Sequence, residues 1–146
     1  MIYLLDANVL IALIDQDHVH HDYAQAWFAE TVTGGWATCP ITEMAFLRIA
    51  GRASYQLPGG PAEMADILKQ VLSRPGHVFW ADSLSLVASP LVDSGKLTNH
   101  SQVTDTYLLA LAAQNNGQLA TFDRRLITHA VVGGASALHL IRGNAH

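Results

Sequence analysis

Short apolar runs alternate with longer segments of helical periodicity along the chain, and this alternation constrains the fold more than any other feature. The apolar runs predict strands at residues 2–5, 36–39, 77–81, 119–122 and 138–141. Because helical segments separate most of these strands, we expect the strands to pair in parallel between two layers of helices. The sequence therefore predicts one three-layer α/β/α domain over residues 1–146, with a mostly parallel sheet of about five strands.

Helix signals between the strands complete this prediction. Helices are expected at residues 7–14, 19–31, 40–50, 61–73, 84–97 and 101–115, with a polar loop at 51–60. The helix at 84–97 contains Pro90 and is expected to be interrupted there. Ser101 is expected to cap the last helix, which the Asn116-Gly117 pair ends in a left-handed conformation.

The composition is that of a protein with a substantial core. Half of the residues are hydrophobic and 14% are charged, which argues against intrinsic disorder. No apolar run approaches the roughly 18 residues that span a bilayer, and the first residues carry no basic leader, so we expect no membrane or export role. The single cysteine, Cys39, has apolar neighbours and predicts a buried thiol in the cytoplasm.

The charge balance narrows the functional classes. The chain has 8 Lys and Arg against 12 Asp and Glu, which gives a formal net charge of −4. This balance argues against a protein that coats nucleic acid non-specifically. It is compatible with a nuclease, because cations bound to clustered acids offset their charge locally. The positions of the acids are therefore more informative than their number.

Acidic residues occur where the expected sheet presents its carboxyl edge. Asp6 follows the first predicted strand and Asp123 the fourth, while Glu43 and Asp105 lie in the first turns of two helices that begin at this edge. Ligands of open parallel sheets bind beyond the carboxyl ends of the strands. For Asp6 or Asp123 alone, helix capping explains the acid equally well.

Glu43 and Asp105 fit a capping role less well, because each heads an apolar helix face. Glu43 shares its face with Phe46, and Asp105 shares its face with Leu108. Neither acid has a Lys or Arg three or four positions away, and a buried carboxylate is costly without a partner. Carboxylates from several elements are typical ligands of Mg²⁺ or Mn²⁺, which we expect as the cofactor.

Each of these four acids lies in a short segment that can be compared with known families. The segments are 5–10 (LDANVL), 42–48 (TEMAFLR), 104–112 (TDTYLLALA) and 119–126 (LATFDRRL). Together they resemble the PIN domain family, and specifically the toxin ribonucleases of VapBC-type toxin–antitoxin pairs. The likeness extends over essentially the whole chain, although residues 54–100 match in pattern only.

The resemblance implies a catalytic metal site made of four acids and two supporting polar residues: Asp6, Glu43, Asp105, Asp123, Asn8 and Thr121. Such a site suits metal-assisted hydrolysis of RNA by one or two ions. Asp6 and Asp105 would be the primary ligands, and Glu43 and Asp123 would complete the shell or act through water. For Asn8, a hydrogen bond to Asp6 and a plain role at the helix start both remain open.

The resemblance also implies partners. We expect a homodimer and a small antitoxin that blocks the acidic site, with the region 19–72 as the docking surface. RNA phosphates need cations beside the acids, and the candidates are Arg48, Arg52, Arg124 and Arg125. Ordinary surface charge explains each arginine as well. The sequence does not distinguish transfer, ribosomal and messenger RNA.

Other interpretations compete with a nuclease. The cluster of His18, His20 and His21 beside Asp22 suggests zinc, but its spacing matches no standard motif, and solvated residues at a helix start explain it better. A phosphatase of the haloacid dehalogenase type also has an acid after its first strand, but it needs a second Asp where this chain has Asn8. A receiver-like, non-catalytic interaction module is the third alternative.

Overall fold

In this computed structural model, which describes residues 1–52 and 59–142, five strands form one sheet in the order β3-β2-β1-β4-β5. The strands are β1 (Tyr3–Leu5), β2 (Trp36–Thr38), β3 (His77–Phe79), β4 (Gln118–Thr121) and β5 (Leu138–Leu140). Each neighbouring pair is parallel, so every carboxyl end lies at the same edge. The predicted parallel sheet is therefore confirmed.

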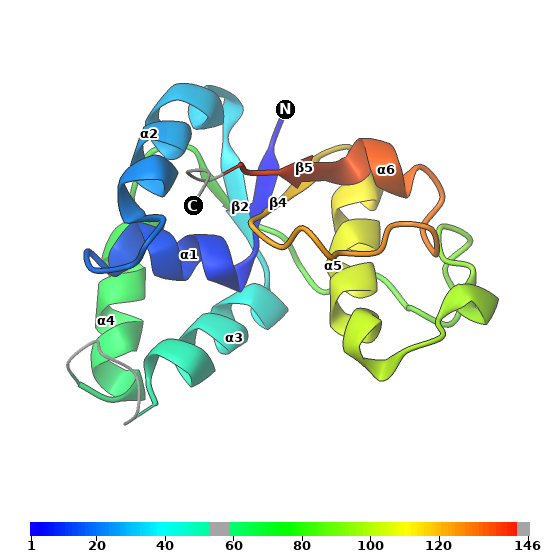
Figure 1. The fold of residues 1–146 in the computed structure, drawn as a ribbon, viewed down its shortest axis with the longest axis horizontal. Coiled ribbons are helices and arrows are strands. Elements are labelled where there is room, and N and C mark those ends of the chain that lie inside the picture. The colour runs from blue at the N-terminus through cyan, green and yellow to red at the C-terminus, as the bar shows by residue number, and fades with distance from the viewer. Residues whose placement is uncertain (53–58, 143–146) are drawn as a thin grey trace.

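Helices cover both faces of this sheet (Figure 1). They are α1 (Ala7–Ile14), α2 (His21–Thr31), α3 (Pro40–Ala50), α4 (Pro61–Leu72), α5 (Val103–Gln114) and α6 (Gly134–Ala137). One apolar core lies under α1 to α4 and contains Leu5 and Trp36, while the other lies under α5 and α6 and contains Leu4 and Ala37. Neighbouring strand residues thus face opposite layers, which confirms the three-layer architecture. None of the helices in the described ranges is long and apolar enough to cross a membrane.

The prediction of a helix at residues 84–97 is wrong. The segment contains turns and one short 3₁₀ turn, η2 (Ser94–Lys96). Pro90 cannot donate a helical hydrogen bond and disfavours helical backbone in the residue before it. The segment pairs instead with a distant loop, through a bridge between Val92 and Val131. Of the loop predicted at 51–60, residues 53–58 lie outside the described residues.

The start of α5 also differs from the prediction. Asn99, rather than Ser101, caps a 3₁₀ turn, η3 (His100–Gln102), that runs directly into α5. The Asn99 side chain accepts a hydrogen bond from the Ser101 N–H, and the Gln102 side chain accepts one from the Asn99 N–H. This reciprocal arrangement satisfies two donors that a single Ser cap would leave open. It fixes the first turn of α5, which carries Asp105.

The turn after α5 places β4 beside β1. Asn116 has a φ of 56°, which confirms the predicted left-handed end of the helix. A Cβ atom on the buried Gly117 would lie 2.4 Å from the carbonyl oxygen of Ile2, so only glycine fits this close approach. The next N–H, that of Gln118, donates to the same carbonyl and begins the pairing of the two strands. The ends of β1 and β4 are thereby brought to one place.

Candidate active site

Asp6 joins β1 to α1 at the carboxyl edge and serves as the N-cap of the helix. Its Oδ1 accepts a hydrogen bond of 2.7 Å from the Ala7 N–H, and its Oδ2 accepts one of 2.8 Å from the Thr121 hydroxyl on β4. Burial raises the pKa of Asp6, these two hydrogen bonds lower it, and the charge of Asp123 raises it, with a net increase. Asp6 is therefore both a helix cap and a member of a group of acids.

Thr121, the buried last residue of β4, connects the polar side chains of this edge. Its hydroxyl donates to Asp6 and accepts hydrogen bonds of 3.1 Å from both the Asn8 side-chain amide and the Asp123 N–H. Asn8 in turn accepts a hydrogen bond from the Phe122 N–H. Asn8 thus reaches Asp6 through Thr121 instead of binding the carboxylate itself.

Replacing Thr121 should show how much this connection stabilises the fold. Thr121→Val keeps the shape but leaves three polar groups without their partner, and we expect it to lower the free energy of unfolding by about 2–3 kcal/mol. Thr121→Ser keeps the hydroxyl and should lose less than about 1 kcal/mol. Urea unfolding in chelator measures both variants, and equal stability of the two would contradict a linking role for the hydroxyl.

Asp105, in the first turn of α5, is the most strongly perturbed acid of the group. Burial raises its pKa from 3.8 to about 6, with further contributions from the charges of Asp6 and Asp123. No hydrogen bond from a residue in the described ranges reaches its carboxylate. The three aspartates therefore lie close enough to repel one another, and Asp105 is the one that the protein compensates least.

The raised pKa of Asp105 should make the free energy of unfolding depend on pH. Between pH 3.8 and about 6 the folded state holds the Asp105 proton more tightly than the unfolded state does. In chelator, the contribution of Asp105 to the free energy of unfolding should therefore fall as the pH rises through this window and stay level above it. Asp105→Asn removes this contribution and should be more stable than the wild type near pH 7 by about 1 kcal/mol, since solvent partly screens the half-exposed group.

Thermal or urea unfolding of the wild type and Asp105→Asn between pH 4 and pH 8 checks this expectation. Asp66→Asn is the matched control, because Asp66 is an exposed acid on α4. The control should keep the pH dependence of the wild type. An Asp105→Asn protein that also keeps it would rule out a strained carboxylate at this position.

Glu43 is held at the end of β2, two strands away from β4. Pro40 and a reciprocal pair of hydrogen bonds between Cys39 and Thr42 start α3, so that Glu43 falls in its first turn. The Thr38 hydroxyl donates a 2.6 Å hydrogen bond to Glu43 Oε2, and His77 Nε2 lies 2.7 Å from the same hydroxyl oxygen. Thr38 and His77 are far apart in the sequence. The parallel register of β2 and β3 pairs His77 with Trp36, which places its side chain diagonally across from Thr38.

The donor chemistry of this edge fits a hard divalent cation. The four acids offer only oxygen atoms, which Mg²⁺ and Mn²⁺ prefer, and a cation would relieve the repulsion that raises the pKa of Asp105. Within residues 1–52 and 59–142, however, no three His, Cys, Asp or Glu side chains are spaced as a finished metal site. Asp6, Asp105 and Asp123 are grouped by their mutual charge effects, whereas Glu43 is tied to Thr38.

Comparison with known proteins identifies the family. A family model, PIN domain, matches residues 3–132, a range that contains all four acids. The chain belongs to the PIN domain family.

This PIN domain has similar relatives in Mycobacterium tuberculosis. It is 41% identical over 137 residues to Ribonuclease VapC44, a match that covers 94% of this chain and 96% of that protein. It is 44% identical over 134 residues to Ribonuclease VapC39, covering 91% and 96% respectively. It is 42% identical over 126 residues to Ribonuclease VapC29, covering 86% and 89%.

The four arginines predicted to contact RNA phosphates lie in different parts of the structure. Arg125 lines a pocket of about 370 Å³ together with Asp105 and Asp123. Arg124 lines a separate pocket of about 240 Å³ with Leu140 and Arg142, a residue that the sequence analysis missed. The remaining two, Arg48 and Arg52, are exposed at the far end of α3 and just beyond it. Arg125 is thus the arginine that shares a pocket with the acids.

The histidine cluster has a structural explanation. His18 Nδ1 accepts a hydrogen bond from the His20 N–H, and His21 Nδ1 lies 2.8 Å from the carbonyl oxygen of Ala12 in α1. The His20 ring stacks on Phe122 with a centroid distance of 4.8 Å. Each of the three rings thus has a contact within the fold, at or just before the start of α2.

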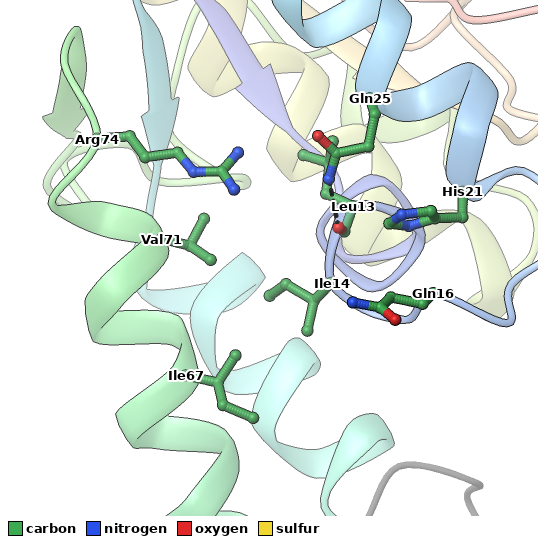
Figure 2. A pocket seen from close by; sticks show the side chains of 8 residues that line it. All are labelled: Leu13, Ile14, Gln16, His21, Gln25, Ile67, Val71 and Arg74. Carbon is green, nitrogen blue, oxygen red and sulfur yellow. Dashed lines mark hydrogen bonds between the residues drawn. The ribbon is translucent and has the colours of Figure 1, made fainter.

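A further pocket, of about 250 Å³, lies between helices at the C-terminal end of α1, where Leu13 and Ile14 line it (Figure 2). Figure 2 shows Ile14 of α1 facing Ile67 and Val71 of α4, with Gln25 of α2 bonded to the Leu13 carbonyl oxygen at 2.7 Å. None of the four acids lines this pocket. This pocket is therefore separate from the acidic edge of the sheet.

Proposed function

We propose that this PIN domain is a metal-dependent endoribonuclease, the toxin of a VapBC-type pair, that hydrolyses RNA phosphodiester bonds with Mg²⁺ or Mn²⁺. The observation that carries this proposal is the group of Asp6, Asp105 and Asp123 at one sheet edge, where the charge of Asp123 contributes to the raised pKa of Asp6 and the charges of Asp6 and Asp123 contribute to the raised pKa of Asp105. Its membership in the family and the relatives named as ribonucleases support the same activity.

The proposed role of each acid follows from its hydrogen bonds and its pKa. Asp6, oriented by Thr121, and the uncompensated Asp105 would hold the cation, with Asp123 and Glu43 binding it directly or through water. A divalent cation supplies Lewis acidity toward a phosphate and lowers the pKa of water. Glu43 keeps one oxygen beyond its bond to Thr38, with which it would orient a water or accept a proton. Arg125 would contact a flanking phosphate.

The phosphatase alternative fits less well. A haloacid dehalogenase-type reaction needs an acid two positions after Asp6, where this chain has Asn8. The Asn8 amide is already bonded to Thr121 and to the Phe122 N–H, so it is a structural link of the edge. It has no proton of the kind that a general acid transfers.

Cleavage of RNA by purified protein tests the proposal. With Mn²⁺ the wild type should cleave a pool of transfer, ribosomal and messenger RNA, and chelator should abolish cleavage. Asp105→Asn should lower the rate at least about 100-fold, because a ligand of the cation is lost. The control Asp66→Asn should cleave at the wild-type rate, and sequencing of the cut ends identifies the substrate.

Equal cleavage by the wild type and Asp105→Asn would refute the assignment, because a contaminating nuclease would then explain the signal. Thermal melting gives an independent control for metal binding. Millimolar Mn²⁺ should raise the melting temperature of the wild type and of Asp66→Asn, since a ligand of the folded state stabilises it. The increase should be mostly absent in Asp105→Asn.

We also propose a homodimer that binds a small antitoxin through the pocket between α1, α2 and α4. Half of the residues that line the pocket belong to the region 19–72. The pocket presents Ile67 and Val71 beside His21 and Arg74, a mixture that suits an amphipathic segment of a partner protein.

Ile67→Glu places a charge on the apolar wall and should weaken inhibition by the antitoxin at least about tenfold while cleavage continues. Gln70→Glu, on the exposed side of α4, is the control and should be inhibited normally. Inhibition assays with the product of the neighbouring gene, together with light scattering for the dimer mass, measure both expectations. Undiminished inhibition of Ile67→Glu would exclude this pocket as the docking site.

A further inference from the structure

Three side chains connect the edge strand β3 with the acidic edge of the sheet. His77 Nε2 lies 2.7 Å from Thr38 Oγ1, and Thr38 Oγ1 lies 2.6 Å from Glu43 Oε2. The second distance is typical of a hydrogen bond from a hydroxyl to an ionised carboxylate. The three residues come from β3, β2 and α3, so the connection depends on the fold and not on neighbouring positions in the sequence.

The direction of the two hydrogen bonds follows from the number of protons. A threonine hydroxyl has one proton, and a carboxylate only accepts, so Thr38 donates its proton to Glu43. His77 Nε2 must then donate to the Thr38 oxygen. A neutral His77 is thereby restricted to the tautomer that carries its proton on Nε2.

Packing holds the side chains of Thr38 and His77 in place. Thr38 is fully buried in β2, which lies between β1 and β3. His77 pairs with Trp36 in the parallel register, and the two rings are 4.7 Å apart. Trp36 is itself fully buried and donates to the Pro75 carbonyl oxygen. The His77 ring therefore has a defined position from which to reach Thr38.

We propose that His77 is a positioning residue of the active site, which orients the Glu43 carboxylate through Thr38; the inference rests on the ribonuclease function proposed above. With the His77 donor present, the Thr38 hydroxyl has one favourable direction for its proton, toward Glu43 Oε2. Glu43 then presents its other oxygen to the acidic edge in a fixed orientation. Partners that orient an acid of a metal site typically change activity by 10–100-fold.

Two substitutions at His77 separate hydrogen bonding from packing. His77→Phe keeps an aromatic ring against Trp36 but has no donor, and it should lower kcat about tenfold with KM changed less than about twofold. His77→Gln loses the ring but offers an amide donor, and it should retain most of the activity. The reverse order, with Phe active and Gln impaired, would overturn the proposal in favour of a packing role.

Combined variants test whether the effect passes through Thr38 to Glu43. Thr38→Val should lower kcat as much as His77→Phe, and the double variant should lose little more. In a Glu43→Gln background, His77→Phe should have no further effect. Additive losses would overturn the proposed connection.

The other edge strand supplies a matched control. His139 on β5 accepts a hydrogen bond of 3.0 Å from Trp27 Nε1 and is half-buried, as His77 is. His139→Phe loses this bond at a distance from Glu43, so it should lower the melting temperature and change kcat less than about twofold. A loss of kcat equal to that of His77→Phe would attribute both effects to general weakening of the sheet.

Nitrogen NMR of the histidine rings adds a measurement that does not depend on cleavage. At pH 8 the His77 signals of the wild type should show the Nε2–H tautomer, and Thr38→Val should shift the Nε2 resonance. The opposite tautomer would overturn the inference. Normal cleavage by His77→Phe would overturn the inference alone, whereas a wild type that cleaves no RNA would overturn the proposed function and the inference with it.

Discussion

The pairing of β1 with β4 is the interaction on which the acidic edge depends. It brings together residues about 115 positions apart, and it ends in the hydrogen bond from Thr121 to Asp6. Gly117 permits the close approach that begins this pairing, and Thr121 fixes the far end, where Asn8 and Asp123 converge on the same hydroxyl. The hydrogen bonds among Asp6, Asn8, Thr121 and Asp123 thus depend on the pairing of β1 with β4. A change in the register of this pairing would separate these residues.

Electrostatics at this edge oppose the stability that the cores supply. The ion pairs in the described ranges, Lys69 with Asp66 and Lys96 with Asp93, are exposed and lie outside the group of acids. The raised pKa of Asp105 is therefore a local strain that neighbouring side chains do not relieve. Functional sites commonly keep such strain, because groups arranged for a ligand are poorly arranged for the fold alone.

The sequence predicts those features that depend on local pattern. Apolar runs locate the strands, and the acids expected after two of these strands, Asp6 and Asp123, lie just beyond the carboxyl ends of β1 and β4. The helix predicted at 84–97 failed because Pro90 and the long-range bridge of Val92 outweighed a weak periodicity. The cap of α5 was missed although the spacing of Asn99 and Gln102 is a readable signal. The contact of Thr38 with His77 has no such signal, since it depends on strand register.

The separation of Asp6 from Asp105, Thr121 and Asp123 along the chain has a consequence for synthesis on the ribosome. Translation proceeds from the amino terminus, so a nascent chain that has been extended to about residue 100 contains Asp6 and Glu43 but none of the other three. Its β1 also lacks β4 as a neighbour. The acidic edge is therefore completed only after residue 123 has left the ribosome, and every chain that ends before this residue lacks part of the group of acids.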